Sequence, residues 1–188
     1  DAMTKLPIEA ALPDLRAALL SHNMAVLQAP PGAGKTTRVP LFLLEENLCK
    51  GRVLMLEPRR LAARAAAERL AETLGEPVGT TGGHRMHGDS KTSDGTRIAV
   101  ITEGILTRIA QNDPDLTGIG CIIFDEFHER SLQADTGLAF ALEIRSVLRE
   151  DLQLIAMSAT LDAAPVAALM GNAPVITSAG RSYPVTAK

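Results

Sequence analysis

Two short polar stretches of the sequence carry the side chains needed to hold and split a polyphosphate. In the first, residues 29–37, the glycines Gly32 and Gly34 are each followed closely by polar or small residues, and Lys35 and Thr36 come directly after the second glycine. Glycines allow successive backbone N–H groups to converge on an anion, and a helix that starts at the lysine would add its positive end. With Ala in place of the first glycine, this is the phosphate-loop pattern of proteins that bind nucleoside triphosphates.

The residues of this loop have separate expected roles. Lys35 should reach the β- and γ-phosphates, and the Thr36 hydroxyl should ligate Mg²⁺. The alternative is an ordinary glycine-rich turn before a helix, but the motif falls between an expected strand and an expected helix, which favours phosphate binding. The nucleotide-binding residues expected from the pattern are Pro31, Gly32, Ala33, Gly34, Lys35, Thr36 and Thr37.

The second stretch follows the apolar run 121–124 and begins Asp125, Glu126, Phe127, His128. Two carboxylates at the tip of a buried strand are costly unless a cation compensates for them. Beside a phosphate loop, Asp125 would hold Mg²⁺ through water, and Glu126 would orient the attacking water molecule. His128 is a further catalytic candidate, as a residue that couples the site to its surroundings. The alternative is that the two carboxylates simply cap the next helix.

Strands and helices alternate along the chain, and both motifs lie where strands end. Short apolar runs predict strands at residues 24–28, 53–56, 98–101, 121–124, 152–157 and 175–177. Helical patterns predict helices at residues 35–44, 60–74, 104–111, 134–148 and 163–170. The polar segment 76–96 is expected to be a loop or an irregular connection. This alternation predicts a three-layer α/β domain with a mainly parallel, doubly wound sheet, in which ligands bind beyond the carboxyl ends of the strands.

The composition is that of one globular domain. The 188 residues are 46% hydrophobic and 22% charged, and the net charge of −3 argues against a broad basic surface while allowing a local track of arginines. Cys49 and Cys121 are the only cysteines, so we expect a core position for Cys121, no disulfide, and a reducing, cytoplasmic location. No apolar run has the length of a bilayer span, and no membrane partner is expected. Residues 1–2, ahead of Met3, are expected to be a cloning scar.

Taken together, the motifs resemble those of the DEAH-box branch of the superfamily two helicases. Residues 58–63 (Pro-Arg-Arg-Leu-Ala-Ala) are similar to motif Ia, residues 102–104 (Thr-Glu-Gly) to motif Ib, and residues 158–160 (Ser-Ala-Thr) to motif III. Each tripeptide alone is a weak signal, but five motifs in the family's order at strand ends are a specific one. With Phe127 where the name-giving motif has Ala, the sequence looks closest to the bacterial HrpB group. The similarity covers nearly the whole chain.

The resemblance implies a RecA-like fold, hydrolysis of ATP or another nucleoside triphosphate with Mg²⁺, and 3′-to-5′ movement on single-stranded nucleic acid, usually RNA. It also implies that motifs Ia and Ib contact the nucleic-acid backbone and that motif III couples nucleotide state to domain arrangement. The nucleic-acid-binding residues implied in this way are Pro58, Arg59, Arg60, Thr102, Glu103 and Gly104. The coupling residues are Ser158, Ala159 and Thr160.

Several of these residues have alternative interpretations. The arginines of motif Ia could line a solvated helix face, and either Arg60 or Arg64 could instead stack on the nucleotide base. Residues 102–104 could cap a helix, and the hydroxyls of motif III could either cap a helix or bond the acidic motif. Glu129 and Arg130 fit a structural ion pair as well as a functional one.

The chain ends at Lys188, after the last expected strand, so we expect residues 3–188 to form only the first of the family's two RecA-like domains. The second domain supplies cationic side chains across the cleft, worth about 10³–10⁵ in rate. Without it, we expect slow hydrolysis and no duplex unwinding.

Three other interpretations compete with an RNA helicase domain. A phosphate-loop enzyme that acts on a small molecule or a protein would need an acceptor pocket or a transporter signature, and neither is apparent. A non-catalytic binding module would have lost Lys35, Thr36 or Glu126, and all three are present. A translocase acting on DNA would share every motif described above.

Overall fold

The computed structural model describes residues 7–31, 34–159 and 163–178, which form one eight-stranded sheet with helices on both faces. The strands are β1 (Met24–Gln28), β2 (Arg52–Glu57), β3 (Gly82–Met86), β4 (Asp89–Lys91), β5 (Ile98–Thr102), β6 (Ile119–Phe124), β7 (Gln153–Ser158) and β8 (Val175–Thr177). The helices are α1 (Leu12–His22), α2 (Lys35–Glu45), α3 (Arg60–Leu74), α4 (Glu103–Asn112), α5 (Leu132–Val147) and α6 (Ala164–Leu169), with 3₁₀ turns η2 (Pro7–Ala11) and η3 (Phe127–Glu129).

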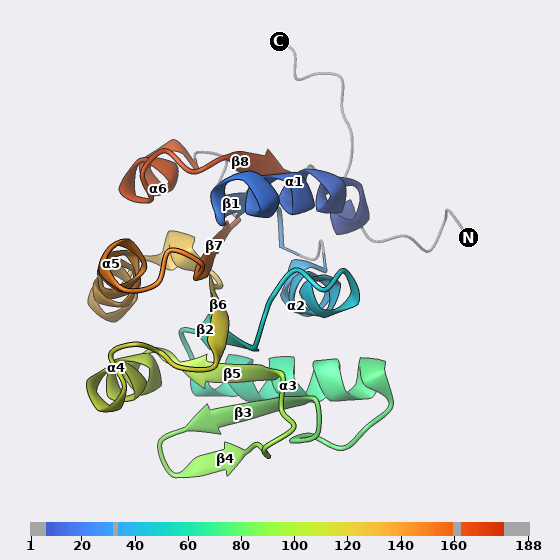
Figure 1. Cartoon of the computed structure of the whole chain (residues 1–188). Coiled ribbons are helices and arrows are strands. Elements are labelled where there is room, and N and C mark those ends of the chain that lie inside the picture. The colour runs from blue at the N-terminus through green and yellow to red at the C-terminus, as the bar shows by residue number, and fades with distance from the viewer. Residues whose placement is uncertain (1–6, 32–33, 160–162, 179–188) are drawn as a thin grey trace.

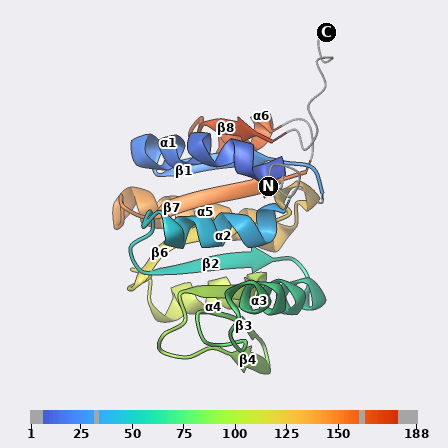
Figure 2. The ribbon, with the colours of Figure 1, turned by 90° about the vertical axis from the view of Figure 1, so that its right-hand side faces the viewer.

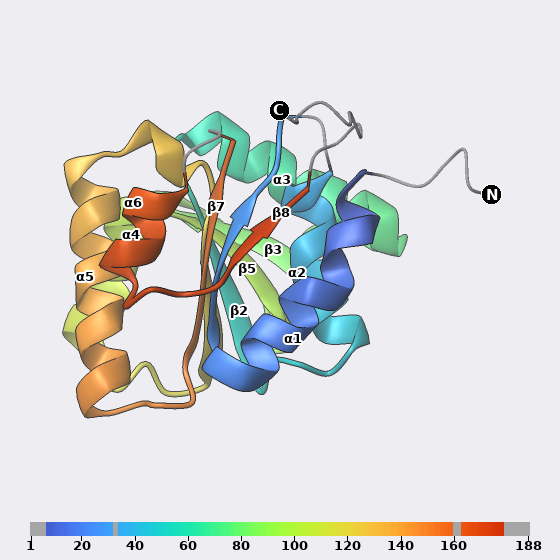
Figure 3. The same ribbon diagram turned by 90° about the horizontal axis from the view of Figure 1, so that it is seen from above.

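The sheet runs in the order β4-β3-β5-β2-β6-β7-β1-β8, and every pairing is parallel except β3 with β4. Helices α1, α2 and α3 cover one face, and α4, α5 and α6 cover the other (Figures 1 and 3). The three-layer, mainly parallel α/β fold predicted from the sequence is therefore confirmed. Strands β1 and β8 and helix α3 have the predicted bounds, and the other predicted elements differ by a few residues at their ends.

Each face of the sheet has its own apolar core, because alternate residues of a strand point to opposite sides. In β1, Ala25 and Leu27 pack in the core beneath α1, α2 and α3, whereas Val26 packs in the core beneath α4, α5 and α6. Figure 2 shows the first of these faces, with α1, α2 and α3 in front of the strands. Burial on both faces explains why the central strands read as continuous apolar runs.

The parallel strands bring the sequence motifs to one end of the sheet, where these strands have their carboxyl ends. The phosphate loop follows β1, motif Ia follows β2, motif Ib follows β5, and the acidic motif follows β6. Motif III begins at the last residue of β7. Because β1, β2, β5, β6 and β7 all run in the same direction, these five chain segments meet beyond their carboxyl ends.

The segment 76–96 was wrongly predicted to be a loop or an irregular connection, because it contains β3 and β4. Strand β3 pairs parallel with β5, and β4 turns back antiparallel to β3. A Cβ atom on Gly83 would lie 2.1 Å from the backbone oxygen of Lys91, so this pairing requires glycine there. These strands are short and partly polar, and backbone hydrogen bonds at the sheet edge define them rather than an apolar pattern.

The N-terminal segment forms η2 and α1, for which the sequence analysis predicted no element. Its side chains Ile8, Leu15 and Leu19 are fully buried against the sheet. Cys49 and Cys121 are free and buried, and the core position predicted for Cys121 is confirmed. Among the described residues, no helix combines the length and apolarity required to cross a bilayer.

Candidate nucleotide site and nucleic-acid face

The phosphate loop and the acidic motif meet through a direct hydrogen bond. The Thr36 hydroxyl Oγ1 donates to Asp125 Oδ2 at 2.8 Å, although the two residues lie 89 positions apart in the sequence. Lys35 is the first residue of α2 and is only 7% exposed. It follows Gly34, whose φ of 90° lies in the left-handed region that favours glycine. The structure thus brings together the residues predicted to hold phosphate and Mg²⁺.

The remaining loop residues are only partly described. Pro31 is exposed at the end of the described part of the loop, and Thr37 lies in the first turn of α2. Gly32 and Ala33, also predicted to bind the nucleotide, lie outside the described residues. The roles of all these residues therefore stay predictions.

The acidic motif leaves β6 in a sharp turn. The Asp125 N–H donates to the Leu56 carbonyl oxygen at 3.1 Å, and Asp125 Oδ1 accepts from the Glu126 N–H at 2.9 Å. Asp125 is buried, and Glu126 has a φ of 55°, which is uncommon for a residue with a side chain. Glu126 occupies the N-cap position of η3, but neither carboxylate makes a side-chain cap there. Helix capping therefore does not account for this pair.

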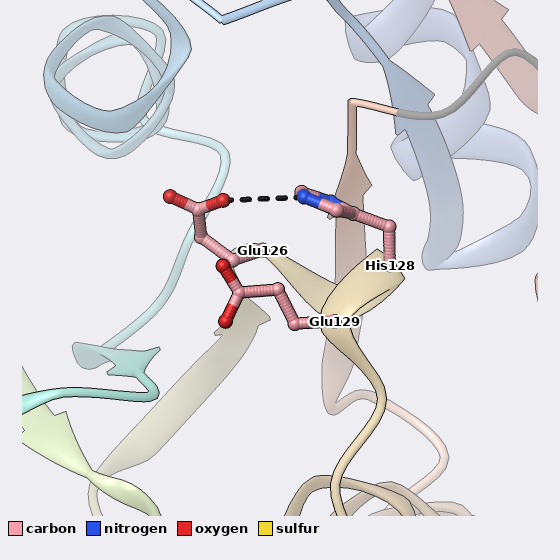
Figure 4. Close-up of side chains that lie close together, drawn as sticks. All are labelled: Glu126, His128 and Glu129. Carbon is pink, nitrogen blue, oxygen red and sulfur yellow. Dashed lines mark ion pairs between the residues drawn. The ribbon is translucent and has the colours of Figure 1, made fainter.

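His128 connects the acidic motif to motif III. Its Nδ1 accepts a hydrogen bond from the Ala159 N–H at 3.0 Å, and its Nε2 lies 3.4 Å from Glu126 Oε1 (Figure 4). The hydroxyls of motif III were predicted to cap a helix or to bond the acidic motif. The contact described here is made by the backbone amide of Ala159, and bonding of the hydroxyls to the acidic motif stays a prediction. Ser158 is buried in β7, so it does not cap α6, whose N-cap is Ala163. Thr160 lies outside the described residues.

Glu57 is a residue of this site that the sequence analysis missed. It is the last residue of β2, 2% exposed, and its carboxyl lies beside those of Asp125 and Glu126. Burial and the adjoining Asp125 and Glu126 carboxylates raise the pKa of Glu57 to about 11, while Lys35 opposes the rise. An acidic residue at the end of a strand neighbouring the acidic motif was the signal that could have identified it.

The donor set fits a hydrated Mg²⁺ ion. Carboxyl oxygens of Glu57, Asp125 and Glu126 lie within 4.8 Å of one another, and the Thr36 hydroxyl bonds the Asp125 carboxylate. Hard oxygen ligands of this kind are what Mg²⁺ prefers, and it usually keeps several of its waters. Glu57 Oε2 is buried and has no hydrogen-bond partner among the described residues, which leaves an acceptor for such a water.

Arg59, Arg60 and Arg64 each make a contact within the protein. Arg59 Nη1 lies 2.7 Å from Glu129 Oε1, and Arg60 donates to the His87 carbonyl oxygen at 2.9 Å. Arg64 pairs with Asp89 of the β3–β4 hairpin. All three residues are exposed as well, so their contact with nucleic acid stays a prediction.

Glu129 and Arg130, which the sequence left open, belong to two different ion pairs. Glu129 pairs with Arg59 of motif Ia, and Arg130 forms a two-point contact with Asp135, with both distances at 2.7 Å. The Glu129 pair links two of the motifs. The Arg130 pair joins the end of η3 to the first turn of α5.

Motif Ib begins α4 at the same edge. Thr102 is the N-cap residue but makes no side-chain cap. Glu103 Oε1 accepts from the Ser131 hydroxyl at 3.0 Å, and Ser131 in turn caps α5. A Cβ atom placed on Gly104 would meet nothing within 4 Å, so the space beside this glycine is open.

A separate hollow of about 460 Å³ lies at the other end of the sheet, where the central strands β2 and β6 begin. Two of its lining arginines serve local structure, because Arg52 donates to the Thr96 carbonyl oxygen and Arg97 to that of Gly51. This hollow shares no residue with the site formed by the motifs.

Comparison with known proteins agrees with this geometry. A family model described as DEAD/DEAH box helicase matches residues 11–169. The chain belongs to this family. It is 51% identical to the ATP-dependent RNA helicase HrpB of Escherichia coli over 183 residues, and 38% identical to the human putative ATP-dependent RNA helicase DHX57 over 172 residues. A crystal structure of the E. coli DExH-box NTPase HrpB superposes with a TM-score of 0.92 and 50% identity over 97% of this chain.

The chain is much shorter than these relatives. It spans 23% of the length of E. coli HrpB and 12% of the length of DHX57, although it is itself matched over 97% and 89% of its residues. It likewise spans 22% of the chain in the HrpB crystal structure. The family and the RecA-like fold are therefore shared across nearly all of this chain, and they correspond to one part of each relative.

Proposed function

We propose that this chain is the first RecA-like motor domain of an ATP-dependent RNA helicase of the DEAH-box type, and that it binds and hydrolyses a nucleoside triphosphate with Mg²⁺. The observation that carries the proposal is the hydrogen bond from Thr36 to Asp125, with Lys35 beside it at the same edge of the sheet. Such a pairing joins the phosphate-binding helix to an acidic strand end, where a metal ion bridges nucleotide and protein.

Each residue has a role in this proposal. Lys35 and the loop amides hold the phosphates, Thr36 and Asp125 hold the magnesium ion, and Glu126 orients the attacking water. Mg²⁺, when bound, neutralises charge that develops on the phosphoryl oxygens. His128, bonded to the Ala159 amide, couples this chemistry to motif III.

Nucleic-acid binding is proposed for the face formed by motifs Ia and Ib. The relatives named as RNA helicases support RNA as the ligand, and the exposed Arg59 at the start of α3 can donate to backbone phosphates without reading sequence. The second RecA-like domain is the proposed intramolecular partner. Without its cationic residues we expect slow hydrolysis by this chain.

Calorimetry with ADP, with and without Mg²⁺, tests the proposal. We expect Mg²⁺-dependent binding that Lys35→Ala weakens by about tenfold or more, because a charge-assisted contact to phosphate is lost. Lys50→Ala, an exposed lysine outside the site, is the matched control and should leave affinity unchanged. Absence of any Mg²⁺-dependent nucleotide binding by the unaltered chain would sink the proposal.

A further inference from the structure

Glu57 lies beside the proposed metal ligand because the strands hold it there. Strands β2 and β6 are paired with Leu56 opposite Phe124, so the next residue of each strand, Glu57 and Asp125, leaves the sheet side by side. The Asp125 N–H donates to the Leu56 carbonyl oxygen at 3.1 Å, which continues the pairing to this point. The closeness of the two carboxyls is therefore built into the backbone.

The Glu57 side chain has one buried oxygen that the protein does not satisfy. Its Oε2 is buried without a hydrogen-bond partner among the described residues. An unpaired buried acceptor costs free energy, so a partner such as a bound water or ion is expected to satisfy it. One carboxyl oxygen from each of Glu57, Asp125 and Glu126 lies within 4.8 Å of the others, which places the Glu57 carboxyl group at the proposed magnesium site.

We propose that Glu57 is a positioning residue of the magnesium site. Its carboxyl group packs beside that of Asp125, and its buried Oε2 accepts a hydrogen bond from the hydration shell of the ion. This inference rests on the proposed function, since it assigns Glu57 a task only when nucleotide and Mg²⁺ bind. Groups that orient metal ligands typically affect metal affinity by about 10–100-fold.

The position of Glu57 also joins the metal site to motif Ia. Glu57 is followed directly by Pro58 and Arg59, and Arg59 pairs with Glu129 of the acidic motif. Glu57 therefore lies beside Asp125 in space and directly precedes motif Ia in the chain.

The test compares Glu57→Leu with Glu57→Gln by titrating Mg²⁺ into each chain in the presence of a fluorescent ADP analogue. Leucine removes the buried acceptor, so we expect the Mg²⁺ affinity of the nucleotide complex to fall about tenfold or more. Glutamine keeps an acceptor for the water, so we expect it to stay within about threefold of the unaltered chain. Affinity for the analogue in EDTA should not change in either variant.

Gln153→Leu is the matched control, because Gln153 is also a buried strand residue with an unpartnered oxygen, but it lies at the opposite end of β7. It should leave the Mg²⁺ titration unchanged, and thermal unfolding of every variant verifies that it is folded. An unchanged Mg²⁺ affinity in Glu57→Leu, or a loss in Glu57→Gln equal to that in Glu57→Leu, would overturn the inference. If the unaltered chain itself shows no Mg²⁺ dependence, the proposed function fails instead.

Discussion

The Arg59 guanidinium of motif Ia lies 2.7 Å from the Glu129 carboxylate of the acidic motif. Arg59 is also a residue proposed to contact nucleic-acid phosphate, and such a phosphate would meet a guanidinium already paired with Glu129. The contact with Glu129 raises the pKa of Arg59, which therefore stays charged. A nucleic-acid strand must compete with Glu129 for this arginine.

Removing the competing carboxylate should therefore strengthen nucleic-acid binding. We expect Glu129→Gln to bind a single-stranded RNA oligonucleotide about two- to fivefold more tightly in fluorescence anisotropy, a factor typical of one exposed ion pair. Arg59→Ala should bind more weakly and make the slope of log affinity against log salt shallower by about 0.7. Asp135→Asn removes an equal charge from the Arg130 pair and is the control. An equal gain in both carboxylate variants would indicate a general charge effect.

The bond between His128 and the Ala159 amide predicts an effect on stability without any ligand. His128→Ala removes the acceptor of this amide, so we expect the free energy of unfolding in urea to fall by about 1 kcal/mol. His87→Ala is the matched control, because the His87 side chain is exposed and only its backbone oxygen bonds Arg60. Equal losses in the two variants would show that the His128 contact contributes nothing specific.

A substitution at Gly104 should change folding stability and nucleic-acid binding in opposite directions. The open space beside it and its place in α4 predict that Gly104→Ala raises the free energy of unfolding by up to about 1 kcal/mol. If a phosphate approaches this backbone closely, the added methyl group should weaken RNA binding at the same time. Gly83→Ala is the contrasting variant and should destabilise the β3–β4 hairpin, since its Cβ would collide with the Lys91 backbone oxygen. Tighter or unchanged RNA binding by Gly104→Ala would argue against motif Ib contact.

The buried Glu57 predicts a pH dependence of stability. Its pKa is about 11 in the folded chain against an ordinary value of 4.5, so the folded state holds this proton more tightly than the unfolded state. The stability that the proton contributes is fully present below about pH 4.5 and is lost as the pH rises toward about 11. Between about pH 6 and pH 9, without nucleotide or Mg²⁺, the unaltered chain should lose up to about 1.4 kcal/mol per pH unit more than Glu57→Gln.

Urea unfolding at several pH values measures this difference. Glu72→Gln, on the exposed part of α3, is the control and should follow the unaltered chain. Parallel stability curves for Glu57→Gln and the unaltered chain would show that Glu57 does not keep its proton in the folded state.

Much of the fold followed from local features of the sequence. Apolar runs flanked by helical patterns predicted six strands close to their observed positions, because buried parallel strands are apolar on both faces. The motifs after β1 and β6 predicted that Thr36 and Asp125 would meet, since parallel strands end at the same edge. Strands β3 and β4 escaped prediction because they are short and partly polar, so backbone pairing defines them rather than an apolar pattern.

The contacts that set the chemistry of the site were decided only in three dimensions. The sequence determined that a polyphosphate site with two carboxylates lies beyond the parallel strands, since residue type and spacing are local properties. The register of β2 against β6 decided that Glu57 stands beside Asp125. The turn at η3 decided that Glu129 meets Arg59, 70 positions away. Strand register and side-chain direction depend on packing of the whole domain, so residue type and spacing alone did not predict these two contacts.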